Sequence, residues 1–239
     1  MIDLSGYRVT DQYFGAPYLD EDEEHTEPGP HSHIKAGFAG ADTRFQFAFP
    51  PAEQWQGRMF NPLSGAHGGD EQFFSTPLGE MIGGMTVSFR LGGYMVQSNQ
   101  GHIGDDIDQA GGEDPRPYGH GASAEAARVS KYVAAQIYGE PPHHSYVFGG
   151  SGGGRRSPLC LENAPDAWDG ALPFMGGGDI APKGSKESVS YTHLRAHETV
   201  LDFVCRLLLV QKNIQASCSI IPTGIAIILI RFRNLMLTQ

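Results

Sequence analysis

The chain has 239 residues, with 17 Lys and Arg against 27 Asp and Glu, and a formal net charge of −10 at pH 7. Residues 1–188 are more acidic still, because 12 basic and 25 acidic residues give a net charge of −13. An acidic surface of this kind disfavours binding to nucleic acid and to anionic membranes, so we expect neither as a partner.

Cysteines and the start of the chain give little indication of the compartment. Cys160 is the one cysteine of residues 1–188. It forms no internal disulfide there, and we expect it to be a small buried hydrophobic residue. The first residues lack a basic stretch followed by an apolar core, so we expect no signal peptide and, by default, a cytoplasmic protein.

The first third of the chain is predicted to hold an acidic arm and then strands. Residues 1–30 include an acidic, proline-broken stretch, which is typical of a solvated arm or linker. Arg44–Phe49 alternates, which places Phe45, Phe47 and Phe49 on one face of a strand. Further strands are predicted near 58–61, 85–90 and 94–98.

The next segments alternate between helices and strands. A loop rich in glycine, aspartate and proline covers 101–121, and a helix is predicted over 123–138, closed by Gly139. A strand then ends at Phe148, a helix follows over 155–163, and another strand over 170–175. This alternation favours an α/β fold with a mostly parallel sheet and helices on both faces.

The most informative stretch is the glycine-rich turn around Ser151. The β-branched and aromatic residues 144–148 indicate a buried strand, so residues 149–153 form a strand-to-helix turn with sequence GGSGG. A serine there is held in a strained conformation with its hydroxyl exposed, and small residues at Gly149, Gly150 and Gly153 let strand and helix pass closely. The Gly152 amide would supply one oxyanion donor at the helix N-terminus.

Other glycine-rich loops remain as alternatives. A phosphate-binding loop has the glycine spacing of 149–154, but Arg155 and Arg156 stand where Lys and Ser or Thr are needed. A dinucleotide-binding turn requires a third glycine at position 155 and usually opens a domain. The third alternative is a plain flexible loop without a function.

The same residues carry a family resemblance. The runs YVFGGSGGGR (146–155) and ENAPDAWDGALPF (162–174) resemble the nucleophile region of the tannase and feruloyl esterase group of α/β-hydrolases, and an uncharacterised branch of that group in particular. Further matches lie upstream, at 41–51, 57–60, 93–102 and 137–139. The resemblance covers about residues 30 to 180 and implies the α/β-hydrolase fold and a serine nucleophile.

One position departs from the family pattern. The resemblance implies a cysteine immediately before the nucleophile, disulfide-linked to another beside the catalytic histidine, and this chain has Gly150 there. That disulfide cannot form, so the tannase substrate is not carried over.

The acid and the histidine that would activate Ser151 should follow it in the chain. The sequence after Ser151 contains two histidines, His193 and His197, whose spacing is also that of a metal-ligand pair on one helical face. However, Val189–Thr199 and Val204–Leu209 resemble a sequencing-library adapter translated in one reading frame. We therefore expect 31–188 to be the N-terminal part of a hydrolase domain that is incomplete at its C-terminus, and 189–239 to be an artefactual tail.

Weaker site candidates surround the turn. Gly68, within the glycine-rich segment 65–69, could supply the second oxyanion amide. The alternative is that this segment is a glycine turn without such a role. Asp179 follows the strand after the turn, where some hydrolases keep the acid. His102 follows a probable strand end, where such sheets bind ligands.

Several polar clusters favour an unspecialised interpretation. His31 and His33 could be half of a metal site, but no third ligand has a matching spacing nearby, so we expect strand-edge histidines and no metal. Asp105, Asp106 and Asp108 lack the glycine and distal glutamate of a calcium loop. Arg155 and Arg156 are expected on the helix surface, in ion pairs.

The sequence thus predicts a fragment of a serine hydrolase that acts on small-molecule carboxylic esters through an acyl-enzyme. No cofactor is expected, and the chain as given is expected to be inactive, because its acid and histidine are missing. Two alternatives stay open: a non-catalytic binding protein on the same fold, and a nucleotide-binding protein that uses the glycine-rich loop.

Overall fold

The structure is a computed structural model of the chain. It describes residues 2–66, 68–71, 74, 76, 79–80, 83–104 and 117–174, and the backbone of 214–220 and 226–232. The chain divides into two units, Met1–Gly178 and Asp179–Gln239, which are described separately.

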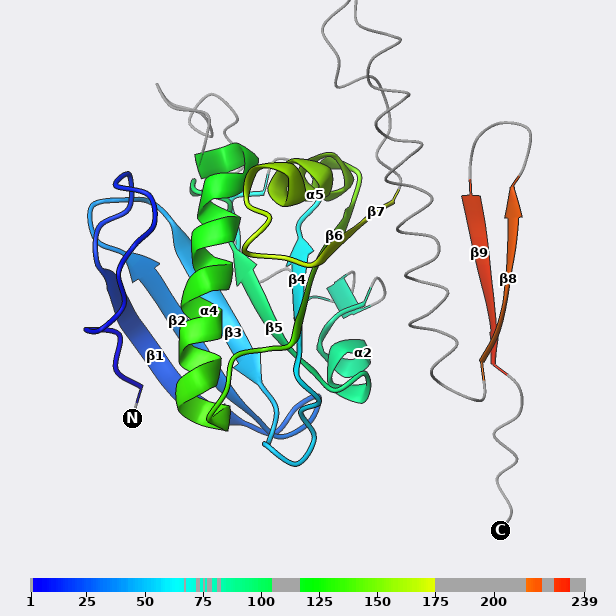
Figure 1. The fold of residues 1–239 in the computed structure, drawn as a ribbon, viewed down its shortest axis with the longest axis horizontal. Helices are drawn as coiled ribbons and strands as arrows, with labels where there is room; N and C mark the ends of the chain where they lie inside the picture. Colours follow the sequence, from blue (N-terminus) through cyan, green and yellow to red (C-terminus); the bar gives the residue numbers. More distant parts are fainter. Residues whose placement is uncertain are drawn as a thin grey trace, which may run out of the picture. The chain divides into compact units, whose positions relative to one another are not determined.

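The first unit is built on one seven-stranded sheet with the order β1-β2-β3-β5-β4-β6-β7 (Figure 1). The strands are β1 (Pro17–His25), β2 (His31–Phe38), β3 (Arg44–Phe49), β4 (Arg58–Leu63), β5 (Gly93–Ser98), β6 (His144–Gly150) and β7 (Gly170–Phe174). The strands predicted around 44–49, 58–61, 94–98, 144–148 and 170–175 are therefore present.

The sheet is mixed, whereas the sequence predicted a mostly parallel one. β1, β2 and β3 pair antiparallel in series, and β3 pairs antiparallel with β5. β5, β4, β6 and β7 form the parallel half. The physical reason lies in the connections: five residues link each of the first two strand pairs, and a link this short permits only antiparallel pairing.

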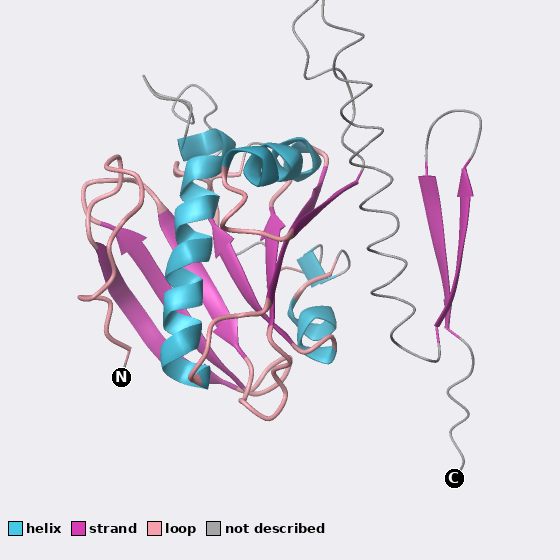
Figure 2. Cartoon of the chain, viewed as in Figure 1, coloured by secondary structure: helices cyan, strands magenta, loops and turns pink. Residues whose placement is uncertain are grey.

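Helix α4 (Ala122–Tyr138) covers one face of the sheet, in front of β3 and β5 (Figures 1 and 2). It ends where Gly139 takes the left-handed conformation, with φ 83°, as the sequence predicted. Phe45, Phe47 and Phe49 lie on this face in a continuous row, with successive ring centroids 5.3 and 5.7 Å apart. The predicted core face of this strand is thus confirmed.

Helix α5 (Gly152–Asn163) shares the core of α4, because Cys160 belongs to the same buried cluster. Helix α2 (Met85–Arg90) packs on the opposite face, where Phe89 contacts His31 at 5.5 Å between ring centroids. The sequence predicted a strand over 85–90, and that prediction is wrong. Helices do cover both faces of the sheet, as expected.

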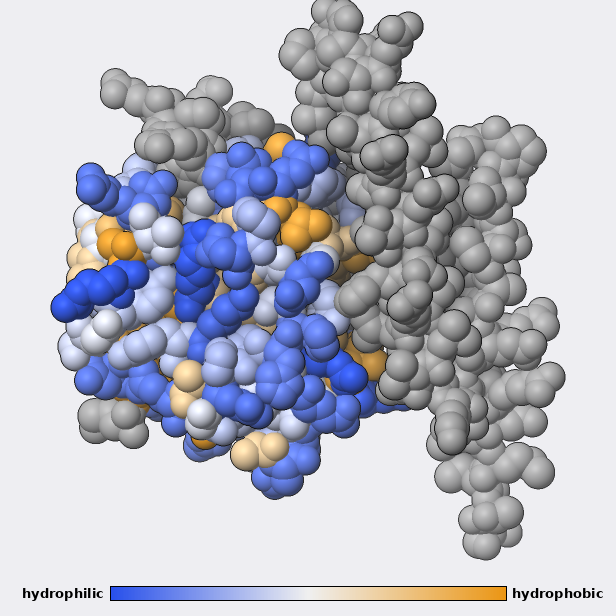
Figure 3. Space-filling model, in the orientation of Figure 1, coloured by the Kyte–Doolittle hydropathy of each residue, from blue (hydrophilic) through white to orange (hydrophobic). Residues whose placement is uncertain are grey.

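The acidic segment forms an edge strand. Residues 17–25, predicted to be part of a solvated arm, pair with β2 from Pro17↔Phe38 to His25↔His31. The strand is nevertheless solvated, because its side chains from Leu19 onward are exposed. An edge strand with charged side chains also discourages pairing with other chains. The face of this unit shown in Figure 3 is mainly hydrophilic, with small isolated hydrophobic areas.

The second unit contains a hairpin of β8 (Ile214–Ile220) and β9 (Ala226–Phe232), paired antiparallel. The predicted helix-like pair His193 and His197 lies outside the described residues. Within the part of the chain that the structure describes, no helix has the length and apolar character needed to cross a membrane.

Candidate active site

Ser151 stands between the end of β6 at Gly150 and the start of α5 at Gly152, so the predicted strand-to-helix turn is present. Its backbone has φ 53° and ψ −114°. A positive φ is unfavourable for a residue with a side chain and is typical of functional positions held by their surroundings. The backbone at Ser151 therefore has the strain that the sequence predicted for this turn.

The backbone of Ser151 is fixed, while its side chain is exposed. Its amide donates to the carbonyl of Phe174 on β7 at 3.2 Å, and its carbonyl accepts from the Arg155 amide at 3.1 Å. The hydroxyl does not cap the helix that follows. The serine oxygen thus stands at the surface on a rigid support.

Close packing explains three of the four glycines of the turn. A Cβ on Gly149 would lie 2.8 Å from the Leu63 carbonyl oxygen, and one on Gly153 would lie 3.0 Å from the Leu63 carbonyl carbon and closer still to its oxygen. A Cβ on Gly152 would overlap the Ala66 carbonyl oxygen. All three obstacles are backbone atoms, which cannot move aside cheaply.

Gly150 differs from these three. A Cβ there would meet only the ring of Phe174, with 2.6 Å to Cε2. The obstacle is the far end of a side chain, so this position does not require glycine in the way its neighbours do. This is the position where the family resemblance implies a cysteine.

The start of α5 is the candidate oxyanion-binding position. The first amides of a helix have no partner within it, and Gly152, Gly153 and Gly154 form the first turn of α5. The loop after β4 runs against them: the Ala66 nitrogen lies 3.0 Å from the place that a Cβ on Gly152 would take. Ala66 has φ 46°, a second non-glycine residue held in the left-handed region.

Gly68 does not offer its amide at this position. That amide donates to the Gly65 carbonyl at 3.2 Å, and the Gly69 amide donates to the Asn99 carbonyl at 2.9 Å. Gly68 has φ 81°, which fits a turn that needs glycine. Of the described amides in this loop, that of Ala66 is the better candidate for the second donor.

Arg156 holds this loop against α5, and the sequence did not predict that role. Its side chain is 4% exposed, contrary to the surface position expected for it. Nη2 donates to the Ser64 carbonyl at 2.7 Å, and Nη1 donates to the Ala66 carbonyl at 3.3 Å and to the Tyr118 hydroxyl at 2.7 Å. Burial lowers the pKa of the Arg156 guanidinium. One signal was available: Arg156 stands one turn before Cys160, on the face that the helix buries. Arg155, by contrast, is exposed as expected.

His102 is connected to the same loop indirectly, through Tyr118. It is 2% exposed, and its ring meets that of Tyr118 edge-on, with 5.5 Å between centroids. Tyr118 in turn contacts Arg156. These contacts link His102 to the loop through Tyr118 and Arg156. Cys160 is fully buried, which raises the pKa of its thiol to about 12, so it behaves as the expected hydrophobic residue.

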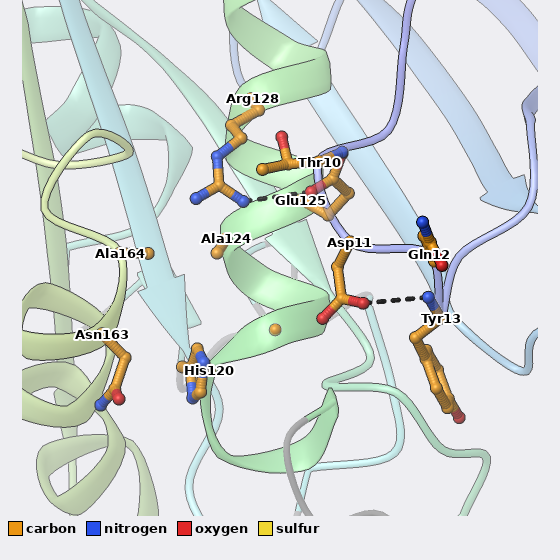
Figure 4. Close-up of a pocket in the computed structure, with 11 residues that line it drawn as sticks. Thr10, Asp11, Gln12, Tyr13, His120, Ala124, Glu125, Arg128, Asn163 and Ala164 are labelled. Carbon is orange, nitrogen blue, oxygen red and sulfur yellow. Dashed lines mark hydrogen bonds and ion pairs between the residues drawn. The ribbon is translucent and has the colours of Figure 1, made fainter.

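A cavity of about 670 Å³ lies beside the start of α4, and Figure 4 shows its lining. The buried Glu125 carboxylate accepts hydrogen bonds there from the Tyr7 hydroxyl and the Thr10 amide, both at 2.8 Å, and from Arg128 at 3.1 Å. Ser151 is not among the lining residues. The hydrogen bonds of Glu125 tie the N-terminal segment to α4, so we assign this carboxylate a structural role.

Asp179, Asp105, Asp106 and Asp108 lie outside the described residues.

A serine in a strained turn between a parallel strand and the helix after it, with backbone amides gathered at the helix start, defines an α/β-hydrolase-type protein. The sequence profile described as "Tannase and feruloyl esterase" matches residues 33–219. The chain therefore belongs to the tannase and feruloyl esterase family. The match includes residues 189–219, so it gives no support to the expectation of an artefactual tail.

Fungal enzymes are among the solved structures to which this chain is similar. The chain is 18% identical to an esterase from Aspergillus oryzae (TM-score 0.49), covering 71% of this chain and 34% of that one. It is 16% identical to feruloyl esterase B from Aspergillus oryzae (TM-score 0.48; 69% and 35% covered). It is also 16% identical to a tannin acyl hydrolase from Aspergillus niger (TM-score 0.44; 67% and 32% covered). The chain thus spans about a third of the length of these structures, and no curated protein matches it.

Proposed function

We propose that the intact protein is a carboxylic ester hydrolase with Ser151 as its nucleophile. The observation that carries this proposal is the backbone of Ser151, with φ 53° between β6 and α5, which presents an exposed hydroxyl next to the first amides of the helix. A strained serine of this kind is costly to keep and has a clear use as a nucleophile.

In the proposed reaction, a histidine base takes the proton of the Ser151 hydroxyl while its oxygen attacks the ester carbonyl carbon. The tetrahedral oxyanion accepts hydrogen bonds from the Gly152 amide and from that of Ala66. Collapse of this intermediate releases the alcohol, which takes up the proton from the histidine. Water then attacks the acyl-enzyme by the same route and releases the acid.

The acid and the histidine are not assigned to residues. We propose that they belong to a part of the intact protein that this chain does not contain, and that the chain as given is inactive. Support comes from the partial coverage of the solved relatives, of whose length the chain spans about a third, and from the adapter-like reading frame of residues 189–209. Loss of one triad member typically lowers the rate about 10⁴-fold or more.

The substrate class proposed is a small-molecule carboxylic ester. Relatives are described as a feruloyl esterase and a tannin acyl hydrolase. This chain has Gly150 where the resemblance implies a cysteine next to the nucleophile. We therefore assign neither of those substrates to this protein.

A fluorophosphonate probe tests the nucleophile, because its phosphorus mimics the acyl carbon and reacts only with an activated serine. The intact parent protein should be labelled at Ser151. Ser151→Ala should abolish labelling, while Ser32→Ala, at a partly exposed serine on β2, should leave it unchanged. Gly152→Val should slow labelling, because the new side chain would push Ala66 away.

The same probe also defines the result that would contradict the nucleophile assignment. If the parent is folded by circular dichroism and stays unlabelled while a known serine esterase in the same tube reacts, the nucleophile assignment is wrong. Thermal stabilisation by ATP or NAD that is lost in Arg155→Gln would then favour a nucleotide-binding loop. Absence of both effects would favour a binding protein on the same fold.

A further inference from the structure

Three histidines from two neighbouring strands meet on the face of the sheet opposite α4. His25 on β1 pairs in register with His31 on β2, and His33 lies two residues further along β2 on the same face. The rings of His25 and His33 stack, with centroids 4.7 Å apart and planes within 9° of each other. One ring nitrogen from each histidine lies within 4.8 Å of the other two. The sequence showed only His31 and His33 and no third ligand, because His25 arrives through strand pairing.

Each of these histidines has its other ring nitrogen next to an acceptor. His31 Nδ1 donates to the Gly29 carbonyl at 2.8 Å. His33 Nε2 donates to Gln46 Oε1 at 2.9 Å, and the Gln46 amide nitrogen is held by the Glu71 carbonyl, which fixes the orientation of the amide group. His25 Nε2 lies 3.5 Å from a Glu23 carboxylate oxygen.

These contacts fix the tautomers of His31 and His33. A histidine that donates through one nitrogen carries its lone pair on the other, and metal-bound histidines are oriented in this manner by carbonyl and carboxylate acceptors. His31 therefore has its lone pair on Nε2 and His33 on Nδ1, while the exposed His25 can present either ring nitrogen.

Two of these lone-pair nitrogens are buried without a partner among the described residues. They are His31 Nε2 and His33 Nδ1, on side chains that are 1% and 7% exposed. A buried acceptor without a hydrogen bond costs about 1–3 kcal/mol, so most such groups in proteins have a partner. A ligand that accepts both lone pairs would satisfy these two nitrogens, and a cation does so.

The surroundings favour a cation and leave room for one. His25 and His33 line a cavity of about 470 Å³, together with Glu27 and Glu80. β1 contributes five consecutive acidic residues, 20–24, directly before His25. The basic side chain of Lys35 is already paired, with Nζ 2.7 Å from a Glu21 oxygen. A divalent ion is therefore attracted to this edge of the sheet.

We propose that His25, His31 and His33 bind one Zn²⁺ ion, with the remaining coordination position open to the cavity. Imidazole nitrogens suit zinc and other late first-row metals, whereas Mg²⁺ and Ca²⁺ prefer oxygen ligands. Tetrahedral zinc with bonds of about 2.0–2.1 Å needs nitrogens about 3.3 Å apart. The ligand atoms lie within 4.8 Å of one another, so binding would require the side chains to close by up to about 1.5 Å, which the exposed His25 can do most easily.

The site is remote from the nucleophile. His33 aligns through Ala48, Met95 and Phe60 with Tyr146, four strands away, which corresponds to about 19 Å across the sheet. Ser151 follows the end of β6, five residues after Tyr146 in the chain. The ion would join the edge strand β1 to β2 and thus stabilise the sheet, and it takes no part in ester hydrolysis.

The test uses the full chain in a His193→Gln, His197→Gln background, because those two histidines could bind zinc by themselves. After treatment with a chelator, titration with Zn²⁺ against a chromophoric competitor should show one tight equivalent, and the melting temperature should rise with zinc concentration. Ca²⁺ and Mg²⁺ should leave the melting temperature unchanged.

His25→Gln is the decisive variant, because His25 is 42% exposed and its replacement should not disturb folding. Its zinc affinity should fall about 100-fold or more, given that loss of an orienting partner alone costs about 10–100-fold. His143→Gln removes another exposed histidine, outside the cluster, and should bind zinc as the parent does. Gln46→Met should lower the affinity about 10-fold through the orientation of His33.

Co²⁺ distinguishes this site from cysteine sites, because a thiolate ligand would add a charge-transfer band and three histidines would not. The proposal is overturned if the chain binds no zinc, if His25→Gln binds it as tightly as His143→Gln, or if the Co²⁺ spectrum shows thiolate ligation.

Discussion

Gly153→Ala tests whether close contact between the backbones of α5 and β4 fixes the conformation of the turn at Ser151. Gly153 lies in the first turn of α5, and its missing Cβ leaves space that strand β4 fills. An added Cβ would lie 3.0 Å from the Leu63 carbonyl carbon and 3.1 Å from the Ser64 carbonyl oxygen, and closer still to the Leu63 oxygen. β4 lies between β5 and β6 in the sheet, so its backbone cannot retreat without disturbing both ladders.

The expected loss of stability combines two opposite effects. Overpacking costs about 1–3 kcal/mol, and the upper value applies because the obstacle is backbone in the middle of the sheet. Alanine in place of glycine inside a helix contributes at most about 1 kcal/mol in the other direction. The free energy of unfolding should therefore fall by about 2 kcal/mol, roughly a 30-fold change in the ratio of folded to unfolded protein.

Urea unfolding followed by tryptophan fluorescence measures this difference. Both tryptophans of the chain, Trp55 and Trp168, lie in the first unit, so the signal reports that unit. The matched control is Gly119→Ala, where a Cβ would meet nothing within 4 Å, and it should be neutral or raise stability by about 0.4–1 kcal/mol. If Gly153→Ala stays within about 0.5 kcal/mol of the parent, or if Gly119→Ala is equally destabilising, the steric argument is wrong.

Three further predictions concern the loop, the histidines and the tail. Arg156→Met should lower the free energy of unfolding by about 3 kcal/mol or more, because it leaves buried carbonyls without their charged donor, while Arg155→Met should change it by less than about 0.5 kcal/mol in the same urea assay. Burial and the neighbouring His25 lower the pKa of His33 to about 4. Between pH 6.5 and 4 the unfolded chain therefore binds a proton at His33 and the folded chain does not. The free energy of unfolding should decrease by up to about 3 kcal/mol as the pH is lowered through this range. In the presence of a chelator, His33→Gln should lose this part of the pH dependence, and an unchanged slope would contradict the assignment. Amplification of the locus from source DNA should not return the codons of residues 189–209 in this frame, and finding them there would show that the tail is genuine.

Local chemistry made the elbow predictable from sequence. Glycines on both sides of Ser151, after a β-branched and aromatic run, allow few backbone paths, and a tight strand-to-helix turn is one of them. The α4 helix and its end at Gly139 followed in the same way from helix-forming residues and a left-handed cap. In each case the residues that decide the structure are neighbours in the chain.

The failed strand prediction shows where local chemistry is insufficient. Met85–Arg90 has β-branched and aromatic residues, which favour a strand in isolation, yet it forms a helix. Glycines at 83 and 84 lead into it, and the sheet already places β3 and β4 on either side of β5. The apolar side chains of this segment pack on the face of the sheet, where Phe89 contacts His31. A short apolar run fits a helix or a strand, and its place in the tertiary structure selects between them.

The sequence by itself determined the class of the fold and the position of the strand-to-helix turn at Ser151, because both depend on residues close together in the chain. Only the tertiary structure decided that the acidic segment pairs as β1, that Arg156 turns inward to hold the loop after β4, and that His25 meets His31 and His33. Those outcomes depend on the register of strands and on the partners available at a distance along the chain. No local pattern contains them, because the free energy that selects them comes from contacts that exist only once the sheet has formed.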